Sequence, residues 1–190
     1  MGPAPTPRSS VGRGFFDRPT LDIARDLLGK LLVREVGERR FEGRVVEVEA
    51  YCGPEDRAAH SSRGRTPRTE VMFGPPGHIY VYLIYGMYNC LNFVTAPVGR
   101  PQAVLIRALE PVVGVARCSG PGLLCRAFEI DRSLNGAPIG APGLDIVEDG
   151  YSPGPIHALP RIGVDYAGEW AAQQWRFCLE SPHLSRPLPG

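Results

Sequence analysis

The sequence predicts an α+β fold: a single mixed domain with a curved, mostly antiparallel sheet and a protruding β-hairpin. Apolar residues recur in short stretches with the alternation or continuity of strands, whereas helical spacing occurs in only a few segments. The 23 glycines and 20 prolines favour turns and short strands over long helices. At 190 residues the chain has the length of one domain that buries a substantial core.

Composition and charge exclude several classes of protein. Hydrophobic residues make up 43% of the chain, charged residues make up 22%, and no apolar run is long enough to span a bilayer, so we expect no membrane partner. The formal net charge of +1 decides nothing about nucleic acid, because a local basic face can exist within a neutral total. The five cysteines include no C-x-x-C pair, and the four histidines lack paired ligand spacing. We therefore expect reduced thiols in a cytoplasmic protein, with neither a metal nor a cofactor.

The chain begins with a proline-rich stretch, "MGPAPT". We expect residues 1–14 to be a disordered leader. The domain is then expected over residues 15–180, followed by a C-terminal tail over 181–190.

A helix and two strands open the domain. In "DRPTLDIARDLLGK" apolar residues recur at helical spacing after Thr20, which we interpret as the N-cap, and Gly29 ends the helix. Residues 30–36, "KLLVREV", have the pattern of a strand. Residues 40–51, "RFEGRVVEVEAY", alternate cleanly and predict a second strand.

This second strand carries an unusual polar face. Alternation places Glu47, Glu49 and Tyr51 on one side, with the Cα atoms of the two glutamates roughly 6.5–7 Å apart. Arg107 is a lone charge inside the apolar stretch "VLIRALEP" and should be buried with a carboxylate partner, since an unpaired charge there costs several kcal/mol. Two interpretations remain open: a Glu–Arg pair that only joins two strands, or the same pair orienting a water molecule.

A tyrosine-rich hairpin is predicted in "HIYVYLIYGMYNCLNFVTA". Alternation puts Tyr80 and Tyr82 on one face, and a turn near Tyr85–Gly86 is favoured because glycine reaches positive φ without strain. Tyr85 would then lie at the hairpin tip, with Met87 beside it. Exposed aromatic tips are typical of proteins that insert a side chain into a nucleic-acid base stack, although most tyrosines at hairpin tips are structural.

The loop between the second strand and the hairpin is rich in arginine. "CGPEDRAAHSSRGRTPRTE" has no acidic residue between Asp56 and Glu70. Its arginines could contact a DNA backbone, or they could simply keep the surface soluble. The residues selected for DNA contact are Arg63, Arg65 and Arg68.

The remaining elements are short. Residues 102–111, "QAVLIRALEP", predict a buried strand, and "CSGPGLLCRAFEI" predicts a short helix beginning near Gly122. A stretch rich in glycine and proline encloses a short strand over 144–148, "LDIVE". The chain then returns to a strand that contains Trp175 and Phe177.

Five stretches carry a resemblance to a known family: "EGRVVEVEAYCGPEDRAAHSSRGRTPR", "MFGPPGHIYVYLIYGMYNCLN", "LIRALEP", "CSGPGLLCRAF" and "RIGVDYAGEWA". In this order they closely resemble the alkyladenine (3-methyladenine) DNA glycosylase family, over about residues 15 to 178. The resemblance implies a single mixed α/β domain with a protruding hairpin, distinct from helix-hairpin-helix glycosylases. It also implies a monofunctional DNA glycosylase of base excision repair, which flips out alkylated or deaminated purines and hydrolyses the N-glycosidic bond to leave an abasic site.

The resemblance implies catalytic roles for two residues. Glu49, in "VEAY", matches the general base that activates water, and Arg107 matches the residue that helps to hold that water. Glu47 shares the strand face of Glu49 and is the alternative base; only the match to "EAY" prefers Glu49. A strand-nicking lyase needs an amine nucleophile. The single lysine, Lys30, is far from Glu49 in the sequence, and the other amine is the amino terminus of the expected disordered leader. We therefore expect hydrolysis alone.

The resemblance also implies how DNA is held. Four residues match the base pocket: Tyr51, His60, Tyr82 and Asn92. Tyr51 would face one side of the base, His60 and Tyr82 the other, and Asn92 the purine two-position. Tyr85, with Met87, matches the part that enters the minor groove and fills the gap left by the flipped nucleotide.

The expected partner is double-stranded DNA with a damaged purine, bound by a monomer. A catalytically weak or silent lesion-binding module is the alternative function. Two departures from the family pattern remove potential phosphate contacts and so predict a weaker hold on DNA: the short segment 111–118, and Leu123, where a lysine is common.

Overall fold

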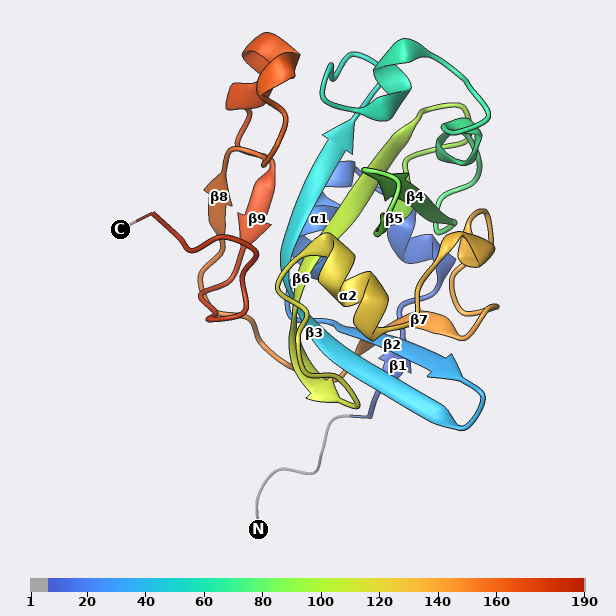
Figure 1. Cartoon of the computed structure of the whole chain (residues 1–190), viewed down its shortest axis with the longest axis vertical. Helices are drawn as coiled ribbons and strands as arrows, with labels where there is room; N and C mark the ends of the chain where they lie inside the picture. Colours follow the sequence, from blue (N-terminus) through green and yellow to red (C-terminus); the bar gives the residue numbers. More distant parts are fainter. Residues whose placement is uncertain (1–6, 190) are drawn as a thin grey trace.

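One nine-stranded sheet organises the residues that the structure describes. The computed structural model describes residues 7–189, and every strand pair within them is antiparallel, in the order β1-β7-β2-β3-β6-β5-β4 (Figure 1). β9 pairs with β3, and β8 pairs with β9. The predicted α+β class with an antiparallel sheet is confirmed.

The strands are β1 (Ser9–Ser10), β2 (Leu31–Val36), β3 (Arg39–Cys52), β4 (Ile79–Ile84), β5 (Tyr88–Thr95), β6 (Gln102–Val113), β7 (Leu144–Glu148), β8 (His157–Leu159) and β9 (Arg176–Cys178). The α-helices of the described residues are α1 (Thr20–Leu27) and α2 (Pro121–Ala127). Short 3-10 helices cover Arg13–Phe16, His60–Arg63, Glu70–Phe73, Arg132–Leu134 and Asp165–Ala172.

The long strand β3 connects the two halves of the sheet. β2 pairs with its first part and β9 with its later part, while β6 follows β3 along the opposite edge. Pairing with β6 is irregular between Val45 and Val48, and Figure 1 shows β3 bending as it leaves β2 and rises beside β6. Irregularities of this kind bend a strand and re-aim its side chains, and this one directly precedes Glu49.

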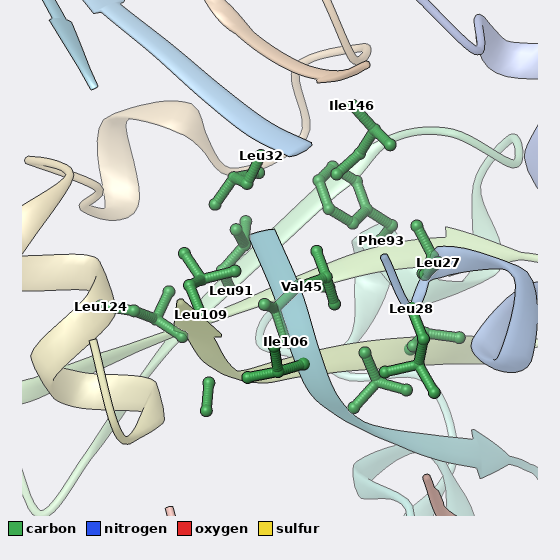
Figure 2. Packing of buried hydrophobic residues seen from close by; sticks show 14 of the residues in the cluster. Leu27, Leu28, Leu32, Val45, Leu91, Phe93, Ile106, Leu109, Leu124 and Ile146 are labelled. Atoms are coloured by element: carbon green, nitrogen blue, oxygen red, sulfur yellow. The ribbon is translucent and has the colours of Figure 1, made fainter. Parts of the chain in front are cut away.

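The two α-helices pack on opposite faces of the sheet (Figure 1). α1 buries Ile23, Ala24 and Leu27 on one helical face, whereas α2 buries Leu124 against β5 and β6. Figure 2 shows side chains from both helices and from β2, β3, β5, β6 and β7 meeting in one apolar cluster. This core holds β3 and β6 rigidly, and those two strands carry the charged residues discussed below.

α1 begins one residue earlier than the sequence predicts. Pro19 occupies the capping position and Thr20 is already helical, so the expected N-cap is wrong by one residue. The Thr20 hydroxyl contacts Thr95 Oγ1 at 2.7 Å and Gln102 Oε1 at 2.5 Å, because the buried helix start faces β5 and β6. Gly29 follows the helix with φ +86°, as expected for a residue that ends it.

The tyrosine-rich hairpin forms as predicted from β4 and β5. Tyr85 and Gly86 both have positive φ, 52° and 67°, as the central residues of tight hairpin turns of type I′ require. The Met87 N–H donates to the Ile84 carbonyl at 3.2 Å and closes the turn. The hairpin therefore ends in a tight turn with Tyr85 at its tip.

The expected disorder of the leader is wrong for the residues that form β1. Ser9–Ser10 pairs with β7, the Ser10 hydroxyl donates to Asp145 at 3.0 Å, and Arg8 forms an ion pair with Glu42 at 2.9 Å. These contacts order the backbone of residues 8–10. β7 pairs with β2 on one side, and β1 pairs with its other edge, which would otherwise have unpaired N–H and C=O groups. Residues 1–6 of the expected leader lie outside the described residues.

The predicted C-terminal strand is shorter than expected. Much of the stretch before it forms the 3-10 helix Asp165–Ala172, and only Arg176–Cys178 is strand, with Phe177 at its centre. Trp175 lies just before β9, yet its carbonyl still accepts the N–H of Ala50 at 2.9 Å. Within residues 7–189, no helix has the length and hydropathy needed to cross a membrane.

Replacing Ile23 by alanine should lower the free energy of unfolding by about 2–5 kcal/mol, because this fully buried side chain leaves a cavity between α1 and the sheet. Urea denaturation, monitored by tryptophan fluorescence, measures this decrease in the free energy of unfolding. Leu21→Ala is the matched control at a partly buried position of the same helix and should cost less. Equal losses would contradict this packing of α1.

Candidate active site

A cleft of about 520 Å³ opens beside the hairpin. Its walls come from β3, the hairpin strands, the start of α2, the chain around Ile162–Tyr166, and Arg186 near the C-terminus. Rings dominate the lining: Tyr51, His60, Tyr80, Tyr82, Tyr85, Tyr88 and Tyr166. All four residues predicted for the base pocket line this cleft, because Asn92 and Tyr82 face it from the hairpin and Tyr51 and His60 from β3 and the following loop.

One wall is a packed set of rings. The His60 ring meets the Tyr82 ring edge-on, with centroids 4.4 Å apart at 80°. Tyr80 is almost fully buried, with its ring 5.4 Å from that of Tyr82 and its hydroxyl 3.2 Å from His60 Nδ1. No ring contact in residues 7–189 joins Tyr51 to His60 or Tyr82, so Tyr51 lines the cleft apart from this wall.

These rings are uncharged at neutral pH. Burial raises the pKa of Tyr51 and of Tyr82 well above the ordinary tyrosine value. Burial also lowers the pKa of His60 to about 4, and the nearby cations Arg68 and Arg63 lower it further. A neutral imidazole is therefore the form of His60 that faces the cleft at pH 7.

Glu49 lies directly behind the cleft lining. Its side chain is 0% exposed, and its carboxylate accepts three hydrogen bonds. Oε2 accepts from the Tyr51 hydroxyl at 2.7 Å and from Arg107 Nη1 at 3.3 Å, while Oε1 accepts from the Ile162 N–H at 2.7 Å. All three donors belong to residues that line the cleft.

Glu47 faces a different set of partners. It is also 0% exposed, and it accepts from Arg176 Nε at 2.7 Å and from both the N–H and the hydroxyl of Ser185, at 2.6 and 2.7 Å. Arg107 joins the two carboxylates, with Nε 3.3 Å from Glu47 Oε1 and Nη1 on Glu49. Burial lowers the pKa of Arg107, but Glu49 and Glu47 outweigh that effect and leave the pKa raised.

A second buried ion pair supports Tyr51 from behind. Arg161 donates to the Asp56 carboxylate at 2.5 and 2.9 Å, and neither side chain is exposed. Arg161 also donates to the carbonyl of Ala50 at 3.0 Å, and its guanidinium lies 4.8 Å from the centre of the Tyr51 ring. Because Ile162 is the next residue, this pair also fixes the N–H that binds Glu49.

The hairpin tip projects its side chains into solvent. Tyr85 is 84% exposed and Met87 is 66% exposed, which is unusual for large apolar side chains. Tyr88, at the start of β5, packs against Gly122 of α2, where an added Cβ would lie 2.8 Å from the ring. The tip is therefore free while its base is anchored to α2.

Asn92 is held in a fixed orientation on β5. It is nearly fully buried, and its amide nitrogen donates to the carbonyls of Tyr80 at 3.2 Å and Cys90 at 3.3 Å. The side chain therefore meets the cleft as a rigid group.

The three arginines selected for DNA contact differ in their surroundings. Arg65 forms a salt bridge with Glu70 at 3.4 Å, and the Arg68 guanidinium lies 5.3 Å from the centre of the Tyr82 ring. Arg63 forms no salt bridge within the part of the chain that the structure describes. Of these three arginines, Arg63 alone has neither a salt bridge nor a ring partner among residues 7–189.

Several residues of the site escape sequence reasoning. Ile162 acts through its backbone N–H, which leaves no trace in the side-chain pattern. Asp56 and Arg161 are 105 positions apart, so only the fold brings them together. Ser185 lies in a proline-containing stretch that looks like a tail. No group of three His, Cys, Asp or Glu residues suited to hold a metal occurs in residues 7–189.

Comparisons with known proteins agree on one family. The family model described as methylpurine-DNA glycosylase (MPG) matches residues 14–183. A protein of Methanocella arvoryzae named "Putative 3-methyladenine DNA glycosylase" is 55% identical over 94% of this chain and 96% of its own length. Proteins with the same name from Anaeromyxobacter dehalogenans and Myxococcus xanthus are 52% and 50% identical, covering 94% and 93% of this chain and 86% and 94% of their own. The chain belongs to the methylpurine-DNA glycosylase family.

Proposed function

We propose that this protein is a monofunctional DNA glycosylase in which Glu49 activates the hydrolytic water. The family and the relatives support the general activity, that of a 3-methyladenine DNA glycosylase of base excision repair. One observation supports the finer mechanism: a buried carboxylate lies directly behind an aromatic cleft and is bonded by three residues of its lining.

A flipped purine would be bound by stacking. Taking a base out of the duplex costs a few kcal/mol, less for a damaged base, and stacking on aromatic rings offsets about 1–3 kcal/mol per base. Tyr82 and Tyr51 offer their rings, and Asn92 offers a rigid group against which an exocyclic amine would clash. A cationic alkylated purine gains more than a neutral one, since electron-rich rings attract positive charge and neutral His60 does not repel it.

Glu49 is better placed than Glu47 to act on that base. The donors bound to Glu49 all line the cleft, whereas Arg176 and Ser185, which bind Glu47, hold it toward β9 and the C-terminal segment. A carboxylate with two oxygens has about four acceptor positions, so the three bonds to Glu49 leave one acceptor position for a water molecule. Glu49 would take the proton of this water and stabilise positive charge on the sugar, while Arg107 orients the carboxylate.

Within residues 7–189 no lysine lines the cleft, which supports hydrolysis without strand cleavage. Lys30 is the single lysine of the sequence, and its ammonium group binds Glu148 at 2.9 Å and lies 5.6 Å from the centre of the Phe15 ring. It does not line the cleft. A Schiff base with the sugar would therefore lack a lysine nucleophile.

The partner we propose is double-stranded DNA bound by a monomer in the cytoplasm. The exposed hairpin tip would enter the minor groove, with Tyr85 filling the gap left by the flipped nucleotide and Met87 beside it. Arg63 would contact phosphate near the cleft; Arg65 and Arg68 would have to leave their present partners to do so.

Glu49→Gln should abolish base release while leaving DNA binding intact, because the amide keeps the shape of the side chain but cannot accept a proton. The measurement is single-turnover incubation with labelled duplexes that carry hypoxanthine, ethenoadenine or alkylated purines, analysed with and without hot alkali. The wild type should give strand breaks only after alkali.

Breaks without alkali would contradict simple hydrolysis. Binding of these duplexes by the wild type without base release from any lesion would favour a silent lesion-binding module instead. Circular dichroism of Glu49→Gln checks that the variant folds, because the change leaves one positive charge uncompensated in a buried network.

Tyr85→Ala should weaken lesion binding and slow base flipping by about tenfold or more, as expected for one lost stacking contact of about 1–3 kcal/mol. The free energy of unfolding should be the same as in the wild type, since the Tyr85 side chain is 84% exposed. Fluorescence of a reporter base beside the lesion measures flipping. Tyr85→Phe keeps the ring and should behave like wild type, and equal defects in both variants would argue against a ring that fills the gap.

His60 should titrate with a pKa of about 4 in the folded protein. Its Cε1–H resonance, assigned by its loss in His60→Gln, gives the midpoint directly by NMR. The unfolded chain takes up this proton at about pH 6.5, so His60 contributes stability that is present above that pH and is lost as the pH falls toward 4. A midpoint near 6.5 would contradict a neutral, desolvated imidazole.

A further inference from the structure

The C-terminal segment contributes a hydroxyl to the buried charge network. The Ser185 Oγ donates to Glu47 Oε1 at 2.7 Å and accepts from Arg107 Nε at 3.3 Å. Its backbone N–H donates to Glu47 Oε2 at 2.6 Å. One residue from outside the sheet therefore contacts both charged groups that the strands β3 and β6 bring together.

The chemistry of a hydroxyl suits this position. A serine has one O–H donor and two acceptor lone pairs, so it can give its proton to Glu47 and still receive the N–H of Arg107. Nε of Arg107 divides its single hydrogen between Ser185 and Glu47, both at 3.3 Å. Loss of the hydroxyl would leave Glu47 alone to hold Nε, and the guanidinium could then tilt away from Glu49.

Contacts on both sides of Ser185 hold residues 184–186 in place. Leu184 is packed into the hydrophobic core. On the other side, Arg176 Nη2 donates to the carbonyl of Arg186 at 2.9 Å, while Nε of the same arginine binds Glu47. Ser185 is thus held between two anchored neighbours, and its geometry is set by the fold.

We propose that Ser185 is a positioning residue of the active site, which fixes Arg107 through a hydrogen bond shared with Glu47 so that Nη1 of Arg107 stays on Glu49. The family model matches residues 14–183 and ends before this residue. This proposal rests on the proposed function, because Ser185 affects catalysis only through its effect on Arg107 and Glu49.

Ser185→Ala should lower the single-turnover excision rate at saturating enzyme by about tenfold, the scale of one hydrogen bond to a charged group. The dissociation constant for lesion DNA should not change, since Ser185 does not line the cleft. Ser185→Thr keeps the hydroxyl and should restore the rate. Ser181→Ala is the matched control, because that hydroxyl lies in the same segment and, among residues 7–189, accepts a hydrogen bond only from the His183 N–H, at 3.1 Å.

A rate unchanged in Ser185→Ala would overturn the proposal. So would an equal rate loss in Ser185→Ala and Ser185→Thr, since the effect would then come from packing rather than from the hydroxyl. A raised dissociation constant at an unchanged rate would also overturn it.

Arg107→Lys, alone and combined with Ser185→Ala, separates this proposal from the proposed function. If Arg107→Lys does not slow excision, the role of Arg107 fails and the proposed mechanism with it. If Arg107→Lys is slow but Ser185→Ala is not, only the role of Ser185 fails. If both are slow, the double variant should be no slower than Arg107→Lys, because a residue that acts through Arg107 has no effect once its guanidinium is gone.

Discussion

Two carboxylates and two guanidiniums neutralise one another inside this protein, and the site is built around that balance. Glu47 and Glu49 are completely buried, and Arg107 and Arg176 are nearly so. Each buried ion loses several kcal/mol of hydration, and the loss is offset only where every oxygen and N–H finds a partner. Removing one member would leave a charge uncompensated, at a cost of about 3–5 kcal/mol.

This demand for partners explains why distant segments converge on β3. At the irregular part of β3, residues next to β9 and in the C-terminal segment supply donors to Glu47, while the chain after Arg161 supplies the N–H for Glu49. The cleft is the other side of the same arrangement. Its lining includes the three groups that hold Glu49, so a base that enters the cleft meets uncharged rings and the guanidinium of Arg107, with the Glu49 carboxylate behind them.

The sequence predicts most of the sheet because its strands have simple patterns. The alternation over residues 40–51 and the turn at Tyr85–Gly86 are local features, and both lie where predicted. The assignment of Ser9–Ser10 and the short length of β9 could not be predicted, because each depends on an edge offered by a strand far away in the sequence.

The candidate site also contains residues that the sequence predicts and residues that only the structure reveals. The sequence, through its resemblance to the family, predicted a base pocket of four residues that all line the cleft, and the neighbouring pair Glu49 and Arg107. The roles of these residues in catalysis stay predictions. The sequence could not identify the groups that hold them. The N–H of Ile162 and the hydroxyl of Ser185 reach their carboxylates across 113 and 138 positions. Ile162 lies in the stretch "RIGVDYAGEWA" but acts through its backbone, and Ser185 lies beyond all five stretches that carry the resemblance.

The pairing of β4 with β5 links the tip of the hairpin to the wall of the cleft. Tyr82 pairs with Cys90, Ile84 pairs with Tyr88, and Tyr85 follows at the turn. Successive strand residues face opposite sides, so inserting or deleting one residue in β4 would move Tyr82 out of the cleft as well as displace Tyr85. A change in the length of the hairpin would therefore alter the cleft wall and the tip together, since the number of residues between Tyr82 and Tyr85 along the chain sets the distance between them.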